Sequence, residues 1–372
     1  MVEFGFSLGM RFATVFFMES SVDPRNVPRL AAEAVRDLNV KAGFGGEFDL
    51  EPLPGGRNNR VFRLRTGDKE LLLKVYFRHR DDRRDRLRQE FEFLQYLWSN
   101  GVRAVPKPIA ADYRESLGLY EFVRGRKMIL QEIQPRHIDD AIAVYLAANL
   151  QKKSPQAEEL LPASEACFSI TKHLESVGKR VERLKGIEVA GDVDADTCRF
   201  VLDELAPFWS VVSVEVKLEY ERNGLLHEEL VFASRCLSPS DFGFHNALLE
   251  EPGVVRFLDF EYAGWDDPAK LACDFANQPD MLLSEELSRR FQEAVIREDP
   301  CPEVLRQRIC CLTPIYQIKW TCIILNDFLP LGRDRALFIQ RKERSEIKPG
   351  QLMKARQMFA RAVDSHGKRG VC

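Results

Sequence analysis

The segment from residue 48 to residue 77 constrains the fold most, because three short apolar runs alternate there with tight-turn sequences. FDLEPL, RVFRLR and ELLLKVYF are separated by a PGG turn and a TGD turn. This texture predicts three antiparallel strands. Residues 27–38 and 81–98 have helical periodicity, and residues 117–123 predict one more strand. The two prolines within residues 105–109 indicate a loop or an edge strand.

Beyond residue 123 the pattern is mostly helical, except for a loop and hairpin over residues 237–262. The chain of 372 residues is long enough for two lobes. We therefore predict an α+β fold with a small antiparallel-sheet lobe and a larger helical lobe. The predicted limits are an N-terminal segment with a helix over residues 1–45, a sheet lobe over residues 46–122 and a helical lobe over residues 123–372.

Composition excludes several classes of protein. The formal net charge of -3 gives no basic field for nucleic acid or for an anionic membrane. The nine cysteines form no C-x-x-C pair, which argues against a zinc ribbon and, without a recognisable signal peptide, favours a reducing cytoplasm. The apolar run over residues 4–18 is interrupted by Arg11 and is shorter than the roughly 20 residues of a membrane span.

The stretch LSPSDFGFHNALLEEPGVVRFLD, residues 237–259, carries the strongest chemical signal. Asp241 and Asn246 lie five positions apart in a loop, and two apolar runs joined by a Pro-Gly turn then lead to Asp259. A hairpin would bring Asn246 and Asp259 together, because they stand at the facing ends of its two strands. An amide oxygen beside a carboxylate suits magnesium, and Asp241 could accept a proton from a hydroxyl.

The D-x-x-x-x-N spacing, followed by a strand, a turn and D-F-E-Y, resembles the aminoglycoside phosphotransferase and choline kinase superfamily. The resemblance implies a two-lobed, protein-kinase-like fold. It makes Asp241 the catalytic aspartate, and Asn246 and Asp259 the metal ligands. One departure is Pro239, which stands where the family usually has a histidine. The D-F-G sequence that begins at Asp241 is coincidental, because in protein kinases that motif follows the metal-binding asparagine.

The predicted strands also offer a nucleotide site. Lys74, inside an apolar strand, is expected to pair with the α and β phosphates of ATP, unless it points to solvent by alternation. Glu90 on the next helix would hold the lysine, and helical register favours it over Glu92. The charged run over residues 78–90 is expected to be a solvated helix face.

Two further segments complete the predicted nucleotide site. The turn with Gly55 and Gly56, which ends near Asn59, could bring backbone amides to the phosphates. Backbone groups of Glu121 and Val123 resemble a hinge that would bind the edge of adenine. The alternative is an ordinary edge strand that ends at a glycine.

Later residues are expected to support the site. Asp267 or Asp274 would cap or brace a helix, and the alternative is a direct contact with the substrate. Trp320 would lie either in the core or in the wall of an acceptor pocket.

Together these features predict an enzyme that uses ATP and Mg2+ to phosphorylate a hydroxyl of a small-molecule acceptor. They predict no nucleic-acid partner and no membrane partner, and the identity of the acceptor and the oligomeric state stay open. The rival from another class is a nucleotide-binding pseudokinase with a regulatory or scaffold role, which Pro239 favours. A protein kinase is disfavoured, because no Ala-Pro-Glu segment follows Asp259.

Overall fold

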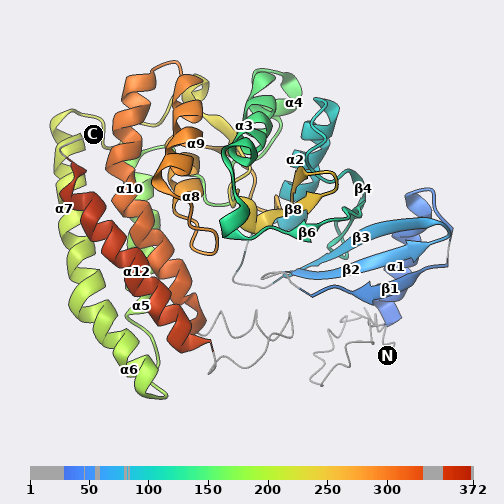
Figure 1. Cartoon of the computed structure of the whole chain (residues 1–372), viewed down its shortest axis with the longest axis horizontal. Helices are drawn as coiled ribbons and strands as arrows, with labels where there is room; N and C mark the ends of the chain where they lie inside the picture. Colours follow the sequence, from blue (N-terminus) through green and yellow to red (C-terminus); the bar gives the residue numbers. More distant parts are fainter. Residues whose placement is uncertain are drawn as a thin grey trace, which may run out of the picture.

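The chain forms two lobes that are joined by a short connection and a shared core (Figure 1). The computed structural model describes residues 29–45, 47–54, 59–78, 82, 84–329 and 347–369. The apolar run over residues 4–18 and the glycines Gly55 and Gly56 lie outside the described residues. None of the described helices is both long and apolar enough to cross a membrane.

The small lobe is a five-stranded antiparallel sheet with the order β1-β2-β3-β5-β4. The three predicted strands and the strand near residue 117 are confirmed, and the proline-containing segment continues into the edge strand β4. The strands are β1 (Asp49–Pro52), β2 (Asn59–Thr66), β3 (Lys69–Tyr76), β4 (Pro108–Asp112) and β5 (Leu117–Glu121).

Successive side chains of β3 point to opposite faces of the sheet, and the two faces have different surroundings. Leu71 and Leu73 are buried against one face of the sheet, where Val35 and Leu38 of α1 (Arg29–Lys41) complete a small apolar core. The side chain of Lys74, one position on, therefore points to the opposite face. That face is turned toward the helix α2 (Arg86–Ser99) and the helical lobe, so Lys74 is buried rather than solvated.

Helix α2 (Arg86–Ser99) belongs to the larger core. It begins at the N-cap Asp85, whose side chain accepts a hydrogen bond from the Arg88 amide, so it starts later than the predicted residue 81. Its apolar face packs into one core with the helical lobe, where the ring of Phe93 stacks on Phe260 with centroids 5.8 Å apart. The sheet lobe is therefore attached to the helical lobe through α2.

Two short sheets carry the loop region of the large lobe. The strands β6 (Arg126–Lys127), β8 (Ala247–Glu250) and β9 (Val254–Phe257) form one, and β7 (Cys236–Ser238) pairs with β10 (Gly264–Asp266) in the other. The predicted hairpin is confirmed, because β8 and β9 pair in register from Ala247 opposite Phe257.

Most helices of the large lobe lie on the side of this loop region that faces away from the small sheet (Figure 1). The long helix α10 packs against α5, α8 and α12, so it forms the central support of the lobe. The helices are α3 (Pro135–Leu150), α4 (Pro155–Glu158), α5 (Ile170–Leu184), α6 (Asp192–Arg199), α7 (Ala206–Arg222), α8 (Pro268–Ala276), α9 (Glu285–Arg297), α10 (Pro302–Ile324) and α12 (Lys348–Gly367).

A buried polar cluster fixes α8 to its neighbours. Asp267, the N-cap of α8, accepts a hydrogen bond from the Ala269 amide at 2.8 Å. Its other oxygen lies 2.6 Å from Arg308 Nε and 2.9 Å from His173 Nε2. Burial alone would raise the pKa of Asp267, but Arg308 and His173 outweigh it and lower the pKa to about 2. The predicted capping role of Asp267 is confirmed.

Replacing Asp267 by Ala should destabilise the protein by about 3–5 kcal/mol, because it leaves the Arg308 charge buried without its partner. Urea-induced unfolding followed by circular dichroism measures this change. The control is Asp139→Ala, which removes the exposed pair with Arg290 and should cost at most about 1 kcal/mol. Equal losses in the two variants would show that the buried cluster does not stabilise the lobe.

Candidate active site

Lys74 lies at the centre of the candidate site, where the two lobes meet. Its Nζ lies 2.7 Å and 3.0 Å from the two carboxylate oxygens of Glu90, and 2.7 Å from Oδ1 of Asp259. Glu92, the competing residue, instead accepts a hydrogen bond from Arg88 on the exposed helix face. A strand, a helix and the end of the β8–β9 hairpin therefore converge on one ammonium group.

Charge and burial act against each other at this centre. Burial lowers the pKa of Lys74, but the carboxylates of Asp259 and Glu90 outweigh it and hold this pKa well above its usual value. Lys74 therefore stays positively charged at neutral pH. An ammonium that keeps its charge can donate charge-assisted hydrogen bonds to an incoming phosphate.

Two tyrosines complete the wall behind Lys74. The Tyr76 hydroxyl donates to Glu90 Oε2 at 2.6 Å, and it lies 2.7 Å from the hydroxyl of Tyr120. The ring of Tyr120 passes over Gly118, where an added Cβ would lie only 2.6 Å from the ring. A glycine at position 118 is therefore required for this arrangement, which fixes the orientation of Glu90.

The loop predicted to be catalytic, over residues 239–246 and called the catalytic loop below, brings Asp241, His245 and Asn246 together. The Asn246 side-chain amide donates to the Asp241 carbonyl at 3.0 Å, and His245 Nε2 lies 3.1 Å from Asp241 Oδ1. His245 belongs to the 3-10 turn Phe244–Asn246, which places it beside the aspartate although it does not occupy the usual histidine position in the sequence. Pro239 therefore does not leave Asp241 without a histidine neighbour.

The backbone on both sides of the loop is unusual. Ser240 and Asp259 both have a φ of 68°, in the left-handed region that L-residues other than glycine rarely adopt. Asp259 itself therefore has a backbone conformation that costs free energy, and Asp241 directly follows a second residue of this kind. Such outliers concentrate at functional sites, because the surrounding structure has to enforce them.

Asn246 and Asp259 present a donor set that fits Mg2+. The Leu258 amide donates to the Asn246 carbonyl at 2.7 Å, which holds the two ends of the hairpin together as predicted. The Asn246 Nδ2 donates to the Asp241 carbonyl, so the side-chain oxygen of Asn246 is the atom that could bind a cation. With Asp259 this gives two hard oxygens, and Mg2+ usually takes its remaining ligands from phosphates and water.

The predicted loop residue Asn59 has a different environment from the one expected. Its side chain is buried, donates to Glu261 Oε2 and accepts from the Phe77 amide at 3.4 Å. Burial raises the pKa of Glu261 to about 7, and the Asp259 carboxylate acts in the same direction. Asn59 therefore connects the start of β2 to the segment after Asp259, and its contact with a nucleotide stays a prediction.

The charged run over residues 78–90 is not simply a solvated face, so that interpretation was wrong. Arg86 is 2% exposed, donates to the Phe77 carbonyl at 3.2 Å and lies 3.8 Å from Glu261. Asp82 is its partner on the other side. The periodicity of charged residues could not reveal this, because the burial comes from the segment after Asp259 that covers the helix start.

The predicted hinge residues lie at the end of β5 and just beyond it. The Glu121 amide donates to the Lys107 carbonyl at 2.8 Å. The backbone group of Glu121 that could bind the edge of adenine is therefore its carbonyl. Its carboxylate accepts from Arg256 of β9 at 2.8 Å and thereby ties the connection to the hairpin. Val123 is buried just beyond it. Adenine binding by these two residues stays a prediction.

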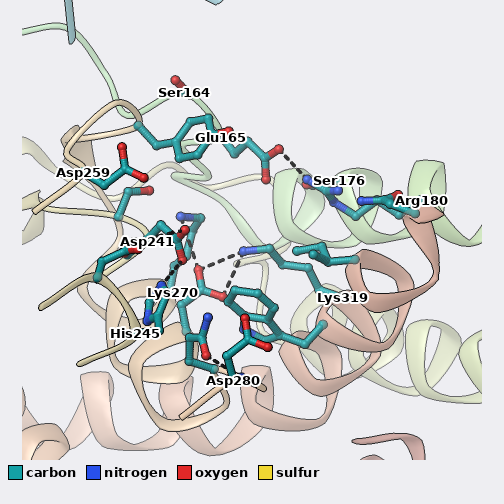
Figure 2. A pocket seen from close by; sticks show the side chains of 18 of the residues that line it. Ser164, Glu165, Ser176, Arg180, Asp241, His245, Asp259, Lys270, Asp280 and Lys319 are labelled. Carbon is teal, nitrogen blue, oxygen red and sulfur yellow. Dashed lines mark hydrogen bonds and ion pairs between the residues drawn. The ribbon is translucent and has the colours of Figure 1, made fainter. Parts of the chain in front are cut away.

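A cavity of about 950 Å³ opens beside these residues. Its lining includes Asp241, Asn246, Asp259, Asp274 and Trp320. Figure 2 shows Asp241 and Asp259 on one side and Lys319 on another. Trp320 is 6% exposed, so it belongs to both the core and the pocket wall. The size is at the upper end of the range for small-molecule pockets, which leaves room for an acceptor beside the catalytic loop.

Sequence reasoning missed several residues of the site. Tyr76, Glu261 and His245 contact predicted residues directly, and Tyr120 contacts Tyr76. For His245 a signal existed, because it lies next to Asn246 in a loop with the predicted catalytic aspartate. For the two tyrosines the alternation of β3 and β5 was compatible with ordinary core positions, so only the folded structure reveals their contact.

Comparison with known proteins agrees with this geometry. A model of the phosphotransferase enzyme family matches residues 49–307, more than half of the chain. No curated protein matches the sequence.

The fold is shared with solved kinases of small molecules. The chain is 16% identical to a choline kinase from Cryptosporidium parvum Iowa II, with 89% of this chain and 99% of that chain covered and a TM-score of 0.51. It is 11% identical to a spectinomycin phosphotransferase in complex with ADP and spectinomycin, with 90% and 98% covered and a TM-score of 0.60. A choline kinase from Streptococcus pneumoniae is 12% identical, with 88% and 98% covered and a TM-score of 0.54.

These likenesses confirm the predicted α+β, two-lobed, protein-kinase-like fold. The match over residues 49–307 covers the strand of Lys74, the catalytic loop of Asp241 and the hairpin that ends at Asp259. In fold the chain also resembles the choline kinases. The chain therefore belongs to the phosphotransferase enzyme family, which includes the aminoglycoside phosphotransferases.

Proposed function

We propose that the protein transfers the γ-phosphoryl group of ATP to a hydroxyl group of a small molecule. The observation that carries this proposal is the convergence of Glu90 and Asp259 on the buried Lys74, beside a cavity that also receives Asp241 and Asn246. Phosphoryl transfer needs positioning, counter-charge and a base rather than covalent chemistry on the protein. Those three requirements correspond to residues that converge at this site.

In the proposed reaction the acceptor hydroxyl lies against Asp241 at the edge of the cavity. Its oxygen forms a bond to the γ-phosphorus while the bond from that phosphorus to the β,γ-bridging oxygen breaks. The hydroxyl proton passes to the Asp241 carboxylate, and ADP leaves. His245, at 3.1 Å, orients the carboxylate.

Lys74 supplies positive charge to the phosphates, and Glu90 keeps the lysine in place together with Tyr76. Asn246 and Asp259 would hold Mg2+, which neutralises phosphate charge when it is bound. No group of at least three His, Cys, Asp or Glu residues among the described residues forms a self-contained metal site. Metal binding should therefore depend on the nucleotide.

A screen of ATP consumption over a panel of hydroxylated metabolites, with mass spectrometry of the products, tests the proposal directly. A phosphorylated product supports it. Binding of ATP with no turnover of any acceptor would instead favour the pseudokinase alternative.

Changing Asp241 to Asn should lower kcat by about 10²–10⁴-fold, because the amide keeps the shape of the side chain but cannot accept the proton. The affinity for ATP with Mg2+ should survive, since the lost interaction belongs to the transition state. Steady-state kinetics and calorimetry measure the two quantities. Loss of nucleotide affinity in this variant would show that Asp241 is a metal ligand and that the site is misassigned.

The protein should bind ATP more weakly in EDTA than with Mg2+, since the two proposed ligands are hard oxygens. Isothermal titration calorimetry measures this difference. In Asp259→Asn the difference should shrink or vanish, because one ligand loses its charge. An Asp259→Asn variant with an intact magnesium effect would contradict the metal assignment.

Replacing Lys74 by Met should weaken ATP binding by roughly tenfold or more, because charge-assisted hydrogen bonds to phosphate are lost. Lys69 is the matched control, since it lies on the same strand with an exposed side chain. Lys69→Met should bind ATP like the original protein. Thermal melts confirm that both variants are folded. Equal affinities for the two variants would place the phosphates away from Lys74.

A further inference from the structure

The part of the cavity formed by α8 and α10, called the floor below, has a carboxylate beside aromatic rings. Asp274 of α8 and Trp320 of α10 line the cavity, and Tyr316 lies one helical turn before Trp320. An ammonium group is attracted both by a carboxylate and by the faces of aromatic rings. These three side chains would therefore suit a cationic ligand, but a side chain of the protein itself takes that place.

Lys319 of α10 occupies this position. Its Nζ lies 2.9 Å and 2.8 Å from the two carboxylate oxygens of Asp274. It also lies 4.8 Å from the ring centroid of Tyr316 and 5.6 Å from that of Trp320. The side chains of Lys319 and Asp274 are 7% and 6% exposed, so the pair is nearly buried, yet both residues line the cavity. Figure 2 shows Lys319 on a different side of the cavity from Asp241.

A second lysine balances the charges of the floor. Lys270 Nζ lies 2.6 Å from Asp266 and 3.5 Å from Asp274, and all three side chains are buried. Two ammonium groups therefore face two carboxylates, and these four groups together carry no net charge. Lys319 and Lys270 would repel an ammonium group of a ligand, and the two aspartates would repel an anion. The floor thus favours an uncharged group.

The other carboxylates that line the cavity, apart from Asp241 and Asp259, have partners of their own. The ion pairs are Glu165 with Arg180, Glu175 with Lys172 and Asp280 with Lys354. Asp327 accepts a hydrogen bond from Gln351 at 2.7 Å. A cationic acceptor would have to displace one of these partners, so the rest of the described lining does not favour a cation over an uncharged molecule.

A hydroxyl group matches the pair of Asp274 and Lys319. An ammonium has three N–H donors, and the hydrogen bonds to Asp274 use two of them. The third can donate to a hydroxyl oxygen, while the same hydroxyl donates its own proton to a carboxylate oxygen of Asp274. The ring of Trp320 lines the cavity beside Lys319 and offers an apolar surface to the C–H groups of the same molecule.

We propose that the acceptor is an uncharged sugar or cyclic polyol, one hydroxyl of which binds the Asp274–Lys319 pair while another faces Asp241. Lys319 is then the specificity-determining residue, because its charge excludes an acceptor with an ammonium group at the floor. The cavity of about 950 Å³ is large enough to hold a sugar ring. This inference rests on the proposed phosphotransferase function and specifies the substrate class of the same site.

Matched pairs of sugars test the charge preference without any variant. Glucose, galactose and mannose are compared with glucosamine, galactosamine and mannosamine at about pH 6, where the amino group that replaces one hydroxyl is protonated. Binding to the full-length protein in the presence of ADP and Mg2+ is measured by saturation-transfer NMR titration, and phosphorylation by ATP is followed separately. Each neutral sugar that binds should bind severalfold more tightly than its amino counterpart.

Two variants test the role of Lys319. Lys319→Met removes the ammonium and leaves Asp274 beside the two aromatic rings, so choline should bind it roughly tenfold or more tightly than it binds the original protein. Lys319→Met combined with Asp274→Asn removes both charges of the pair, so neither partner is left charged and buried alone. This double variant should bind choline no better than the original protein does, and it should lose the preference for the neutral sugar.

The matched control is Lys217→Met on α7, an exposed lysine that does not line the cavity. This variant should keep the sugar preference and the weak binding of choline. Thermal melts show which variants are folded. If a variant of Lys319 does not fold, the comparison of the sugar pairs in the original protein still decides.

Four results would overturn the inference: an amino sugar that binds the original protein more tightly than its neutral counterpart, no binding of any of the six sugars, no gain of choline binding in a folded Lys319→Met variant, or an unchanged sugar preference in the folded double variant. None of these depends on turnover, so the test is separate from that of the proposed function. If neutral sugars bind with the expected preference but ATP is never consumed, the phosphotransferase proposal fails and the sugar site stands. If choline or an amino sugar is phosphorylated best, the phosphotransferase stands and the uncharged acceptor is excluded.

Discussion

The buried ammonium of Lys74 is the contact on which the rest of the site depends. Removing a charge of this kind from water costs several kcal/mol, and the cost is offset only by well-placed partners. Glu90 and Asp259 provide them at 2.7 Å each, from a helix of the first third of the chain and from a hairpin that is 185 positions away from Lys74. The lysine therefore fixes the sheet lobe relative to the catalytic loop.

The catalytic loop shows how a departure from a family pattern can be compatible with the same geometry. Pro239 cannot supply an imidazole, but His245 approaches Asp241 from the other side of the loop. The left-handed backbone at Ser240 and Asp259 is held by the hydrogen bonds around it, among them the bond from Leu258 to Asn246. The strain thus lies where pre-organisation of the two aspartates is useful.

A shared fold leaves the acceptor undetermined, and the walls of the cavity restrict it. Related structures include choline kinases and a spectinomycin phosphotransferase, which resemble this chain over most of their length. In this chain Lys319 lies against Asp274 and two aromatic rings, and α5 lines the cavity with lysines and arginines as well as with Glu175. Function belongs to such sites rather than to the fold, so the charge of the cavity is the better guide to the acceptor.

The sequence by itself determined the strands, the hairpin and the Asp241–Asn246–Asp259 spacing, because local periodicity and turn residues encode them. It also favoured Glu90 over Glu92, since helical register decides which side faces the sheet. The tertiary structure alone decided that Arg86 is buried, that Tyr76 meets Tyr120 and that Lys319 neutralises Asp274. The contacts of Tyr76 with Tyr120 and of Lys319 with Asp274 join residues that are 44 or more positions apart in the sequence. The burial of Arg86 depends on which distant segment covers the start of its helix. No local sequence pattern contains this information.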